Sequence, residues 1–394
     1  MNKTISEEFL SDLNTNVFLR EFSFSKNEFI PTPGDEVEFA DHVVWIDDLL
    51  FIFQVKERHE PKESSEETER KWFEKKVLGF ATKQIRDTLG YLETQDNIVI
   101  TNQRGHNFHL DKNRISDVVK IIVPVPSKSL PEDCWNSKFH ISSSVDFIHI
   151  IPIHDYLGIC RTFITPAEIK EYLDFREKIS TECEEAVKTV LEPALIGQFL
   201  YGDFSEKPDS QYGIYLEALL RNTAEFDIMF ILQNIGDHID VEKSGGDETD
   251  YYKILFEFAK LVGYELREIK QRISLSLQAC DANEFRLPYR IVAPKTGCGF
   301  VFVPVLREDK NHRLNALQNF TYAAKYDQKL NQCIGISFAK DEDAFLIDWA
   351  FLEFPWQEDD EMEKLLETNY PFRELKHENF HRYYFSTDRL SGPT

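Results

Sequence analysis

The chain has 394 residues, of which 42% are hydrophobic and 13% aromatic, so it can bury a large core and is expected to form two or three domains. Forty-five lysines and arginines against 69 aspartates and glutamates give a net charge of −24, which argues against a protein that coats nucleic acid through general electrostatics. No apolar run reaches the roughly 18 residues that span a bilayer, and the first residues lack a signal peptide's features, so the sequence predicts a cytoplasmic protein with no membrane partner.

The first third of the chain predicts a helix, three strands, a second helix and further strands. An extended segment begins at Val17, and a turn is expected between Pro31 and Gly34. Periodicity places the other elements as follows: a helix at 5–13, strands at 37–46 and 49–55, a long helix at 65–92, and strands at 97–102 and 118–126. The core stripe of the long helix has a spacing of four and consists of Phe73, Val77, Ala81, Ile85 and Leu89.

The two strands at 37–46 and 49–55 carry the clearest chemical signal. If Asp47 and Asp48 form a two-residue hairpin loop, Ile46 pairs with Leu49, and counting back places Asp41 opposite Gln54. A longer loop would shift this register, because Asp-Asp is a poorer tight-turn pair than Asn-Gly. Side chains alternate along a strand, so Gln54 and Lys56 share one face. The pattern therefore predicts an acid, an amide and a lysine together at the end of an apolar hairpin.

Asp41, a hairpin and then Gln54-Val55-Lys56 resemble the motif of the PD-(D/E)XK nuclease superfamily. The pattern is most similar to Mrr-like restriction endonucleases, in which glutamine replaces the acid of the (D/E)xK element. The resemblance covers about residues 1–125 and implies a restriction-endonuclease-like α/β core, a mixed sheet flanked by helices. Ala40 stands where the motif has proline, and no tyrosine follows Gln84 as in the RecB-like exonuclease branch.

The resemblance implies a role for each residue of this motif. Asp41 would hold a divalent metal, Mg²⁺ or Mn²⁺, Gln54 would help to place metal or water, and Lys56 would orient or activate the attacking water. Many members add a glutamate from the first helix, a position that Glu7 or Glu8 fits. We choose Glu7 as the second metal ligand because its spacing to Leu10 and Leu13 matches the usual helix pattern better.

Three other features are weaker candidates for function. Lys76 and Lys83 lie seven residues apart on one face of the long helix and are expected to contact a phosphate backbone, although a solvated helix flank explains them equally well. His106 and His109 suggest a histidine metal site, but a second metal-binding element is missing. The six cysteines form no Cys-x-x-Cys pair, and Cys298 has no assignable base, so we expect reduced and mostly buried thiols.

Beyond the hairpin region the chain changes character. Thr165-Pro166-Ala167-Glu168 is a capping box that begins a helical stretch, and residues 236–250 form a polar linker candidate. The last third predicts a helix at 251–261 and strands at 289–293, 299–305, 333–338 and 345–354. We therefore expect a nuclease-like domain at 1–147, a helical middle region at 148–235, and an α+β regulatory or partner-binding domain at 236–394.

The expected function is a metal-dependent endonuclease acting on DNA, gated by its other domains, of the kind found in bacterial restriction and anti-phage defence. A homo-oligomer or an activating protein partner is expected, because an acidic chain fits a gated nuclease better than constitutive DNA binding. Two alternatives stay open. One is an inactive scaffold that keeps the nuclease fold, and the other is a nuclease that acts on RNA.

Overall fold

The structure is a computed structural model that describes residues 4–59, 64–201, 207–214, 216, 228–239 and 246–373. Its contacts divide the chain into two compact units, with the division between residues 223 and 224. The expected class is confirmed at the coarse level: a large mixed sheet flanked by helices is followed by a smaller sheet in the C-terminal part.

The first unit is built on an eight-stranded sheet with the strand order β7-β6-β1-β4-β5-β8-β10-β9. These strands are β1 (Ser23–Lys26), β4 (His42–Ile46), β5 (Leu49–Glu57), β6 (Val99–Asn102), β7 (Asn107–His109), β8 (Asp117–Val125), β9 (Phe139–Ser142) and β10 (Asp146–Ile150). Two short strands, β2 (Glu28–Phe29) and β3 (Val37–Glu38), pair with each other in a separate small sheet. The strand expected at 37–46 is thus interrupted before β4, and the break contains Asp41.

Strand directions in the sheet change beside β5. The strands β1, β4 and β5 form an antiparallel meander, whereas β8 lies parallel to β5 and β10 lies parallel to β8. A parallel neighbour needs a long crossover, and the chain between β5 and β8 supplies one that includes the long helix. The centre of the sheet is covered on both faces, which explains why Leu50 to Phe53 are all fully buried.

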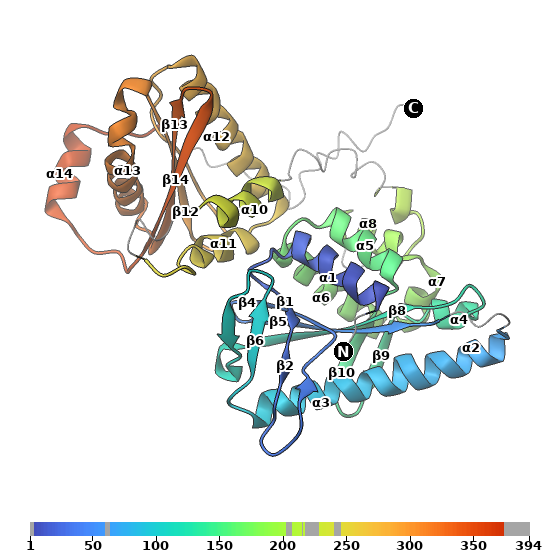
Figure 1. Ribbon diagram of the computed structural model, residues 1–394. Coiled ribbons are helices and arrows are strands. Elements are labelled where there is room, and N and C mark those ends of the chain that lie inside the picture. Colours follow the sequence, from blue (N-terminus) through green and yellow to red (C-terminus); the bar gives the residue numbers. More distant parts are fainter. Residues whose placement is uncertain are drawn as a thin grey trace, which may run out of the picture. The chain divides into compact units, whose positions relative to one another are not determined.

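Helices cover both faces of this sheet (Figure 1). On one side lie α1 (Ile5–Val17), α5 (Ile153–Thr162) and α6 (Pro166–Glu182), and on the other lies the long helix. Alternate side chains of β5 point toward the helices on the two faces of the sheet. Phe51 meets Phe18 at 5.2 Å between ring centroids, and Phe53 meets Tyr156 at 5.5 Å, whereas Ile52 joins the core under the long helix. Gln54 therefore faces the long helix.

The long helix is one continuous element made of three segments that differ in helix type. It comprises α2 (Glu66–Trp72), a π-helical segment η1 (Phe73–Ala81) and α3 (Thr82–Thr94). A stripe at a spacing of four drifts by about 40° per step on an α-helix of 3.6 residues per turn, so the predicted stripe cannot stay on one face of a regular α-helix. The wider π segment offsets this drift. Phe73, Val77, Ala81 and Ile85 are accordingly all buried.

The helices after β10 pack with the sheet in the same unit. These are α5, α6, α7 (Glu184–Thr189) and α8 (Glu192–Tyr201), and Thr165 caps α6 with proline at its first turn, as predicted. Fully buried Arg176 on α6 donates to Glu192 at 2.7 Å and to the carbonyl oxygens of Lys138 and Ile150 at 2.8 and 3.0 Å. The expected boundary at 147 falls inside β10, and this buried network crosses it.

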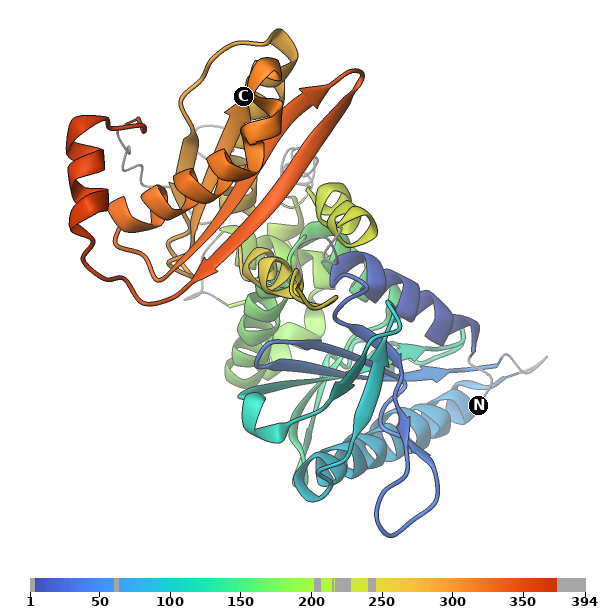
Figure 2. The same cartoon turned by 60° about the vertical axis from the view of Figure 1, so that its left-hand side comes forward.

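The second unit contains a four-stranded sheet with the order β11-β12-β13-β14. The strands are β11 (Tyr289–Val292), β12 (Gly299–Val305), β13 (Gln332–Asp341) and β14 (Ala344–Glu353). All four overlap the strands predicted there. The helices are α10 (Met229–His238), α11 (Tyr252–Ala259), α12 (Gly263–Ala282), α13 (Arg313–Asp327) and α14 (Asp360–Thr368), with α13 against the sheet (Figure 2). A Cβ at Gly335 would lie 1.9 Å from Thr321 Oγ1, so α13 needs glycine there to approach β13.

The predicted state of the cysteines is confirmed. All six are free, and five of them are buried. Burial raises the pKa of the Cys298 thiol, which does not suit a nucleophile. Among the helices in the described part of the chain, none combines the length and apolar character needed to cross a bilayer.

Candidate active site

The β4–β5 hairpin has the predicted turn and register. Ile46 lies opposite Leu49, and the ladder continues to His42 opposite Phe53, one position short of Asp41 and Gln54. Asp47 adopts a φ of 55°, in the left-handed region that two-residue hairpin turns require and that aspartate tolerates. The doubt about an Asp-Asp turn is therefore resolved in favour of the tight loop.

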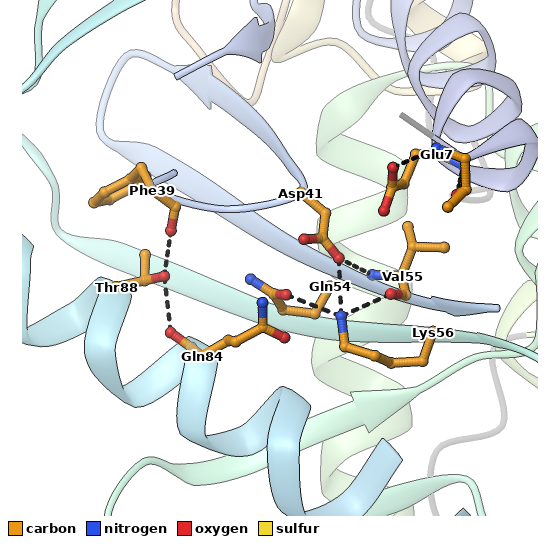
Figure 3. Close-up of polar contacts among 9 residues, drawn as sticks. Glu7, Phe39, Asp41, Gln54, Val55, Lys56, Gln84 and Thr88 are labelled. Carbon is orange, nitrogen blue, oxygen red and sulfur yellow. Dashed lines mark hydrogen bonds and ion pairs between the residues drawn. The ribbon is translucent and has the colours of Figure 1, made fainter. Parts of the chain in front are cut away.

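Asp41, Gln54 and Lys56 come together at the end of this hairpin (Figure 3). The Oδ2 atom of Asp41 accepts hydrogen bonds from the backbone N–H of Val55 at 2.6 Å and from Lys56 Nζ at 3.0 Å. Lys56 Nζ also donates to the carbonyl oxygen of Val55 at 2.7 Å. The side chains of this ion pair are only 12% and 8% exposed, so both charges lie in a largely desolvated place.

The amide of Gln54 fits between these groups in two orientations. In one, its Oε1 atom accepts from Lys56 Nζ at 3.3 Å. In the other, its nitrogen donates to both oxygens of Asp41 at 3.2 Å and to Oε1 of Gln84 at 3.0 Å. The second orientation satisfies more hydrogen bonds, whereas the first turns an additional oxygen toward the ammonium.

The loop that carries Asp41 is held from two sides. The backbone N–H of Phe39 donates to the carbonyl oxygen of Asn27 at 3.1 Å, and that of Ala40 donates to Asn27 Oδ1 at 3.4 Å. The hydroxyl of Thr88 on α3 donates to the carbonyl oxygen of Phe39 (Figure 3). Phe39 and Ala40 are buried, so the carboxylate of Asp41 is placed by packing as well as by hydrogen bonds.

Glu7 lies on α1, which packs on the face of the sheet opposite the long helix. Its carboxylate accepts from the backbone N–H of Thr4 at 2.7 Å, while its own N–H donates to the Thr4 hydroxyl at 3.2 Å, which makes a capping box. In Figure 3 it stands near Val55 at the side of the site. The structure thus gives Glu7 a helix-capping role and does not join it to Asp41 by a hydrogen bond.

Lys76 and Lys83 are both exposed on the long helix. Lys76 Nζ lies 5.2 Å from the ring centroid of Phe80, and Lys56 Nζ lies 6.0 Å from the same centroid. Lys76 is therefore linked to the site through this ring. No comparable contact connects Lys83 to Asp41, Gln54 or Lys56.

Sequence reasoning missed three groups that the structure adds to the site. They are the carbonyl oxygen of Val55, the side chain of Gln84 and the ring of Phe80. In the sequence, Gln84 bears only on the RecB-like exonuclease branch, whose tyrosine does not follow it. Its spacing of four from both Phe80 and Thr88 is a signal that they share a helix face, but the direction of that face required the fold.

The donor set of this site suits a hard divalent cation. Carboxylate, amide and carbonyl oxygens come from Asp41, Gln54 and Val55, and Mg²⁺ is commonly bound by one or two carboxylates with water and substrate phosphate. No group of three or more His, Cys, Asp or Glu side chains able to hold a metal occurs among the described residues, His106 and His109 included. Among the donors of Asp41, Gln54 and Val55, the carboxylate of Asp41 is the anionic one.

Comparisons of the chain with protein-family models, with curated proteins and with solved structures returned no match.

Proposed function

We propose that this protein is a metal-dependent endonuclease that cleaves DNA phosphodiester bonds, with Asp41, Gln54 and Lys56 in its active site and a restriction-endonuclease-like core. The order of elements supports the proposal. A helix (α1) is followed by the antiparallel strands β1, β4 and β5, with the short β2 and β3 between β1 and β4, then by the long helix, by β6 and β7, and by β8 parallel to β5. Apart from β2, β3, β6 and β7, this is the order of helix, three strands, helix and strand that the resemblance implies for such a core.

One observation carries the proposal: the ammonium of Lys56 is held among oxygens at the end of an apolar hairpin. Asp41 Oδ2 lies at 3.0 Å, the Val55 carbonyl oxygen at 2.7 Å and, in one orientation, the Gln54 amide oxygen at 3.3 Å. Burying these polar groups is costly unless they serve a purpose, and oxygens that converge on a cation are what a hard metal requires.

The residues divide the chemistry of phosphodiester hydrolysis between them. A divalent cation would supply the charge that neutralises the phosphate oxygens as they become more negative. Asp41 is the anionic ligand for it, and the oxygens of Gln54 and Val55 are neutral ligands. Lys56 carries three N–H donors that hold and orient a water molecule for in-line attack and attract the anionic phosphate.

The charge distribution supports a gated nuclease. Between Lys56 and Arg86 there are nine lysines and arginines against seven glutamates, a local charge of +2 in a chain of −24. The excess of negative charge opposes DNA binding, although salt at physiological strength largely screens exposed charges that lie more than about 8 Å apart. We propose that an activating partner or self-association overcomes this repulsion, in restriction or anti-phage defence.

The direct test is cleavage of supercoiled, linear and single-stranded DNA and of RNA with Mg²⁺ or Mn²⁺. With its co-purified partner present, we expect DNA cleavage by the wild type, and a loss of at least about a hundredfold in Asp41→Ala and in Lys56→Ala, since each removes a group acting in the transition state. Lys364→Ala, at an exposed lysine of α14 in the second unit, is the matched control for the removal of a lysine and should cleave at close to the wild-type rate.

Activity that persists in both variants, with their folding verified by circular dichroism, would show that the site lies elsewhere. Cleavage of RNA but not of DNA would change the proposed substrate to RNA and leave the proposed roles of Asp41, Gln54 and Lys56 unchanged. A wild type that stays inactive with a co-purified partner would favour the second candidate, a non-catalytic scaffold. Gln54 is the observation that favours it, because a neutral amide stands where an acid would strengthen metal binding.

A further inference from the structure

Four residues of the long helix form a row along the site. Lys76, Phe80, Gln84 and Thr88 are spaced by four, one residue before the buried stripe of Val77, Ala81 and Ile85. Thr88 holds the loop of Asp41, Gln84 lies 3.0 Å from the Gln54 amide, and Phe80 faces Lys56. We call Lys76, Phe80, Gln84 and Thr88 the site row. The π segment, which keeps the buried stripe aligned, also keeps this row aligned with β5.

Phe80 is the unusual member of the site row. It is 45% exposed, although an apolar ring of this size is normally buried. A single exposed phenylalanine needs no explanation by itself. Here, however, two ammonium groups lie near the ring, Lys56 Nζ at 6.0 Å and Lys76 Nζ at 5.2 Å from its centroid, and the first belongs to the proposed active site.

We propose that Phe80 stacks on an unpaired nucleobase next to the scissile phosphate, and that the neighbouring phosphate contacts Lys76. The inference rests on the proposed nuclease function and specifies its substrate as a single strand or a locally opened duplex. An aromatic face flanked by lysines supplies what single-stranded nucleic acid binds: a stacking surface for the base and cations for the backbone.

The physical reason for an unpaired base is access. In a regular duplex both faces of each base are covered by its neighbours, so a side chain can reach only base edges and the backbone. A phenyl ring has no hydrogen-bonding group with which to read an edge. Phe80 therefore gains a partner only from a base that has left the stack, and stacking of this kind tolerates any base sequence.

The test measures binding separately from cleavage. Fluorescence anisotropy in EDTA compares the full-length wild type, Phe80→Ala, Phe80→Trp and Phe285→Ala, using labelled single-stranded DNA, single-stranded RNA and blunt duplex DNA of one sequence. Loss of one stacked base is expected to weaken single-strand binding by Phe80→Ala about 5- to 150-fold. Phe80→Trp should bind as tightly as the wild type or more tightly, and duplex binding should hardly change.

Phe285→Ala is the matched control, since it removes another exposed phenylalanine, in the second unit, and should leave all three affinities unchanged. Lys76→Ala should weaken single-strand and duplex binding alike and reduce the salt dependence by about one phosphate contact. Comparison of the affinities for single-stranded DNA and single-stranded RNA shows which sugar the stacked strand carries.

Any of three outcomes overturns the inference. Phe80→Ala could leave single-strand binding unchanged, or it could weaken duplex binding as much as single-strand binding. The third is that the wild type binds none of the three probes. It fails independently of the proposed function. Cleavage that needs Asp41 but not Phe80 would support the nuclease function and contradict the stacking role. Phe80-dependent binding without cleavage would support the stacking role and contradict the nuclease function.

Discussion

The side chains of Asp41 and Lys56 form an ion pair that is poorly solvated, and each has a further backbone partner. Asp41 accepts from the Val55 N–H at 2.6 Å, and Lys56 donates to the Val55 carbonyl at 2.7 Å. An ammonium and a divalent cation compete for the same oxygens at such a site. The proposed roles therefore predict that the two residues affect metal binding in opposite directions, although both would be needed for cleavage.

Substitution of Asp41 and Lys56 should separate the proposed metal ligand from the residue proposed to act on water. Asp41→Asn is expected to lose Mn²⁺ binding at the site, because it removes the anionic ligand among Asp41, Gln54 and Val55. Lys56→Met should bind Mn²⁺ at least as tightly as the wild type and yet be inactive. Isothermal titration calorimetry measures both affinities. Equal loss of Mn²⁺ binding in the two variants would contradict these roles, and Lys83→Met serves as the control.

At the scale of elements, the site depends on how β5 and the long helix lie beside each other. Arg58, just after β5, makes a bidentate contact with Glu69 of α2 at 3.0 to 3.2 Å, and Thr88 of α3 holds the loop before β4. Both ends of the helix are thus tied to the hairpin. On the other face, the Arg176–Glu192 pair connects α6 and α8 to β10.

The buried network around Arg176 predicts a pH dependence of stability. His149 on β10 lies 3.2 Å from Arg176, and burial together with the positive charges of Arg176, Lys120 and Lys170 holds the pKa of His149 well below its usual value. The unfolded chain therefore binds a proton below about pH 6.5 that the folded protein does not. Stability from this histidine is present above that pH and is lost as the pH falls.

We expect protonation of His149 in the unfolded chain to lower the free energy of unfolding by about 1.4 kcal/mol as the pH falls from 7.5 to 5.5. Urea unfolding of a fragment containing residues 1–223 measures the change, and it should be smaller by that amount in His149→Asn. Exposed His109 provides the control, since His109→Asn should keep the wild-type dependence. An unchanged pH dependence in His149→Asn would show that the histidine is protonated in the folded state too.

At the scale of the whole molecule, the physical unit that carries the site extends beyond the region of the motif. The resemblance covers about residues 1–125, whereas the compact unit continues through α8. Loss of one partner from a buried ion pair such as Arg176–Glu192 typically costs about 3–5 kcal/mol, a large share of a domain's stability. The helices α5 to α8 consequently belong to the same compact unit as the sheet.

Truncation tests this view of the folding unit. A fragment ending at residue 147 cuts β10 and leaves out Arg176 and Glu192, so we expect it to show no cooperative thermal transition by circular dichroism. A fragment ending at residue 223 should unfold cooperatively and bind Mn²⁺ like the full chain. Cooperative unfolding of the shorter fragment would mean that the helices are dispensable. Cleavage by the longer fragment without a partner would support gating by the second unit.

The sequence by itself determined the local features of the protein. The two-residue spacing between apolar strands predicted the hairpin register, and the alternation of side chains predicted that Gln54 and Lys56 share a face. These features depend on neighbours in the chain. The spacing of four along the long helix was also visible, but it was interpreted as α-helix, and the π segment shows how the buried stripe stays on one face.

Only the tertiary structure decided which distant residues join the site and where the folding unit ends. Gln84 and Phe80 face Gln54 and Lys56 because the long helix crosses β5, and β10 extends the sheet by pairing in parallel with β8. Such contacts join residues far apart in the chain, so they depend on packing between layers, which local periodicity does not encode.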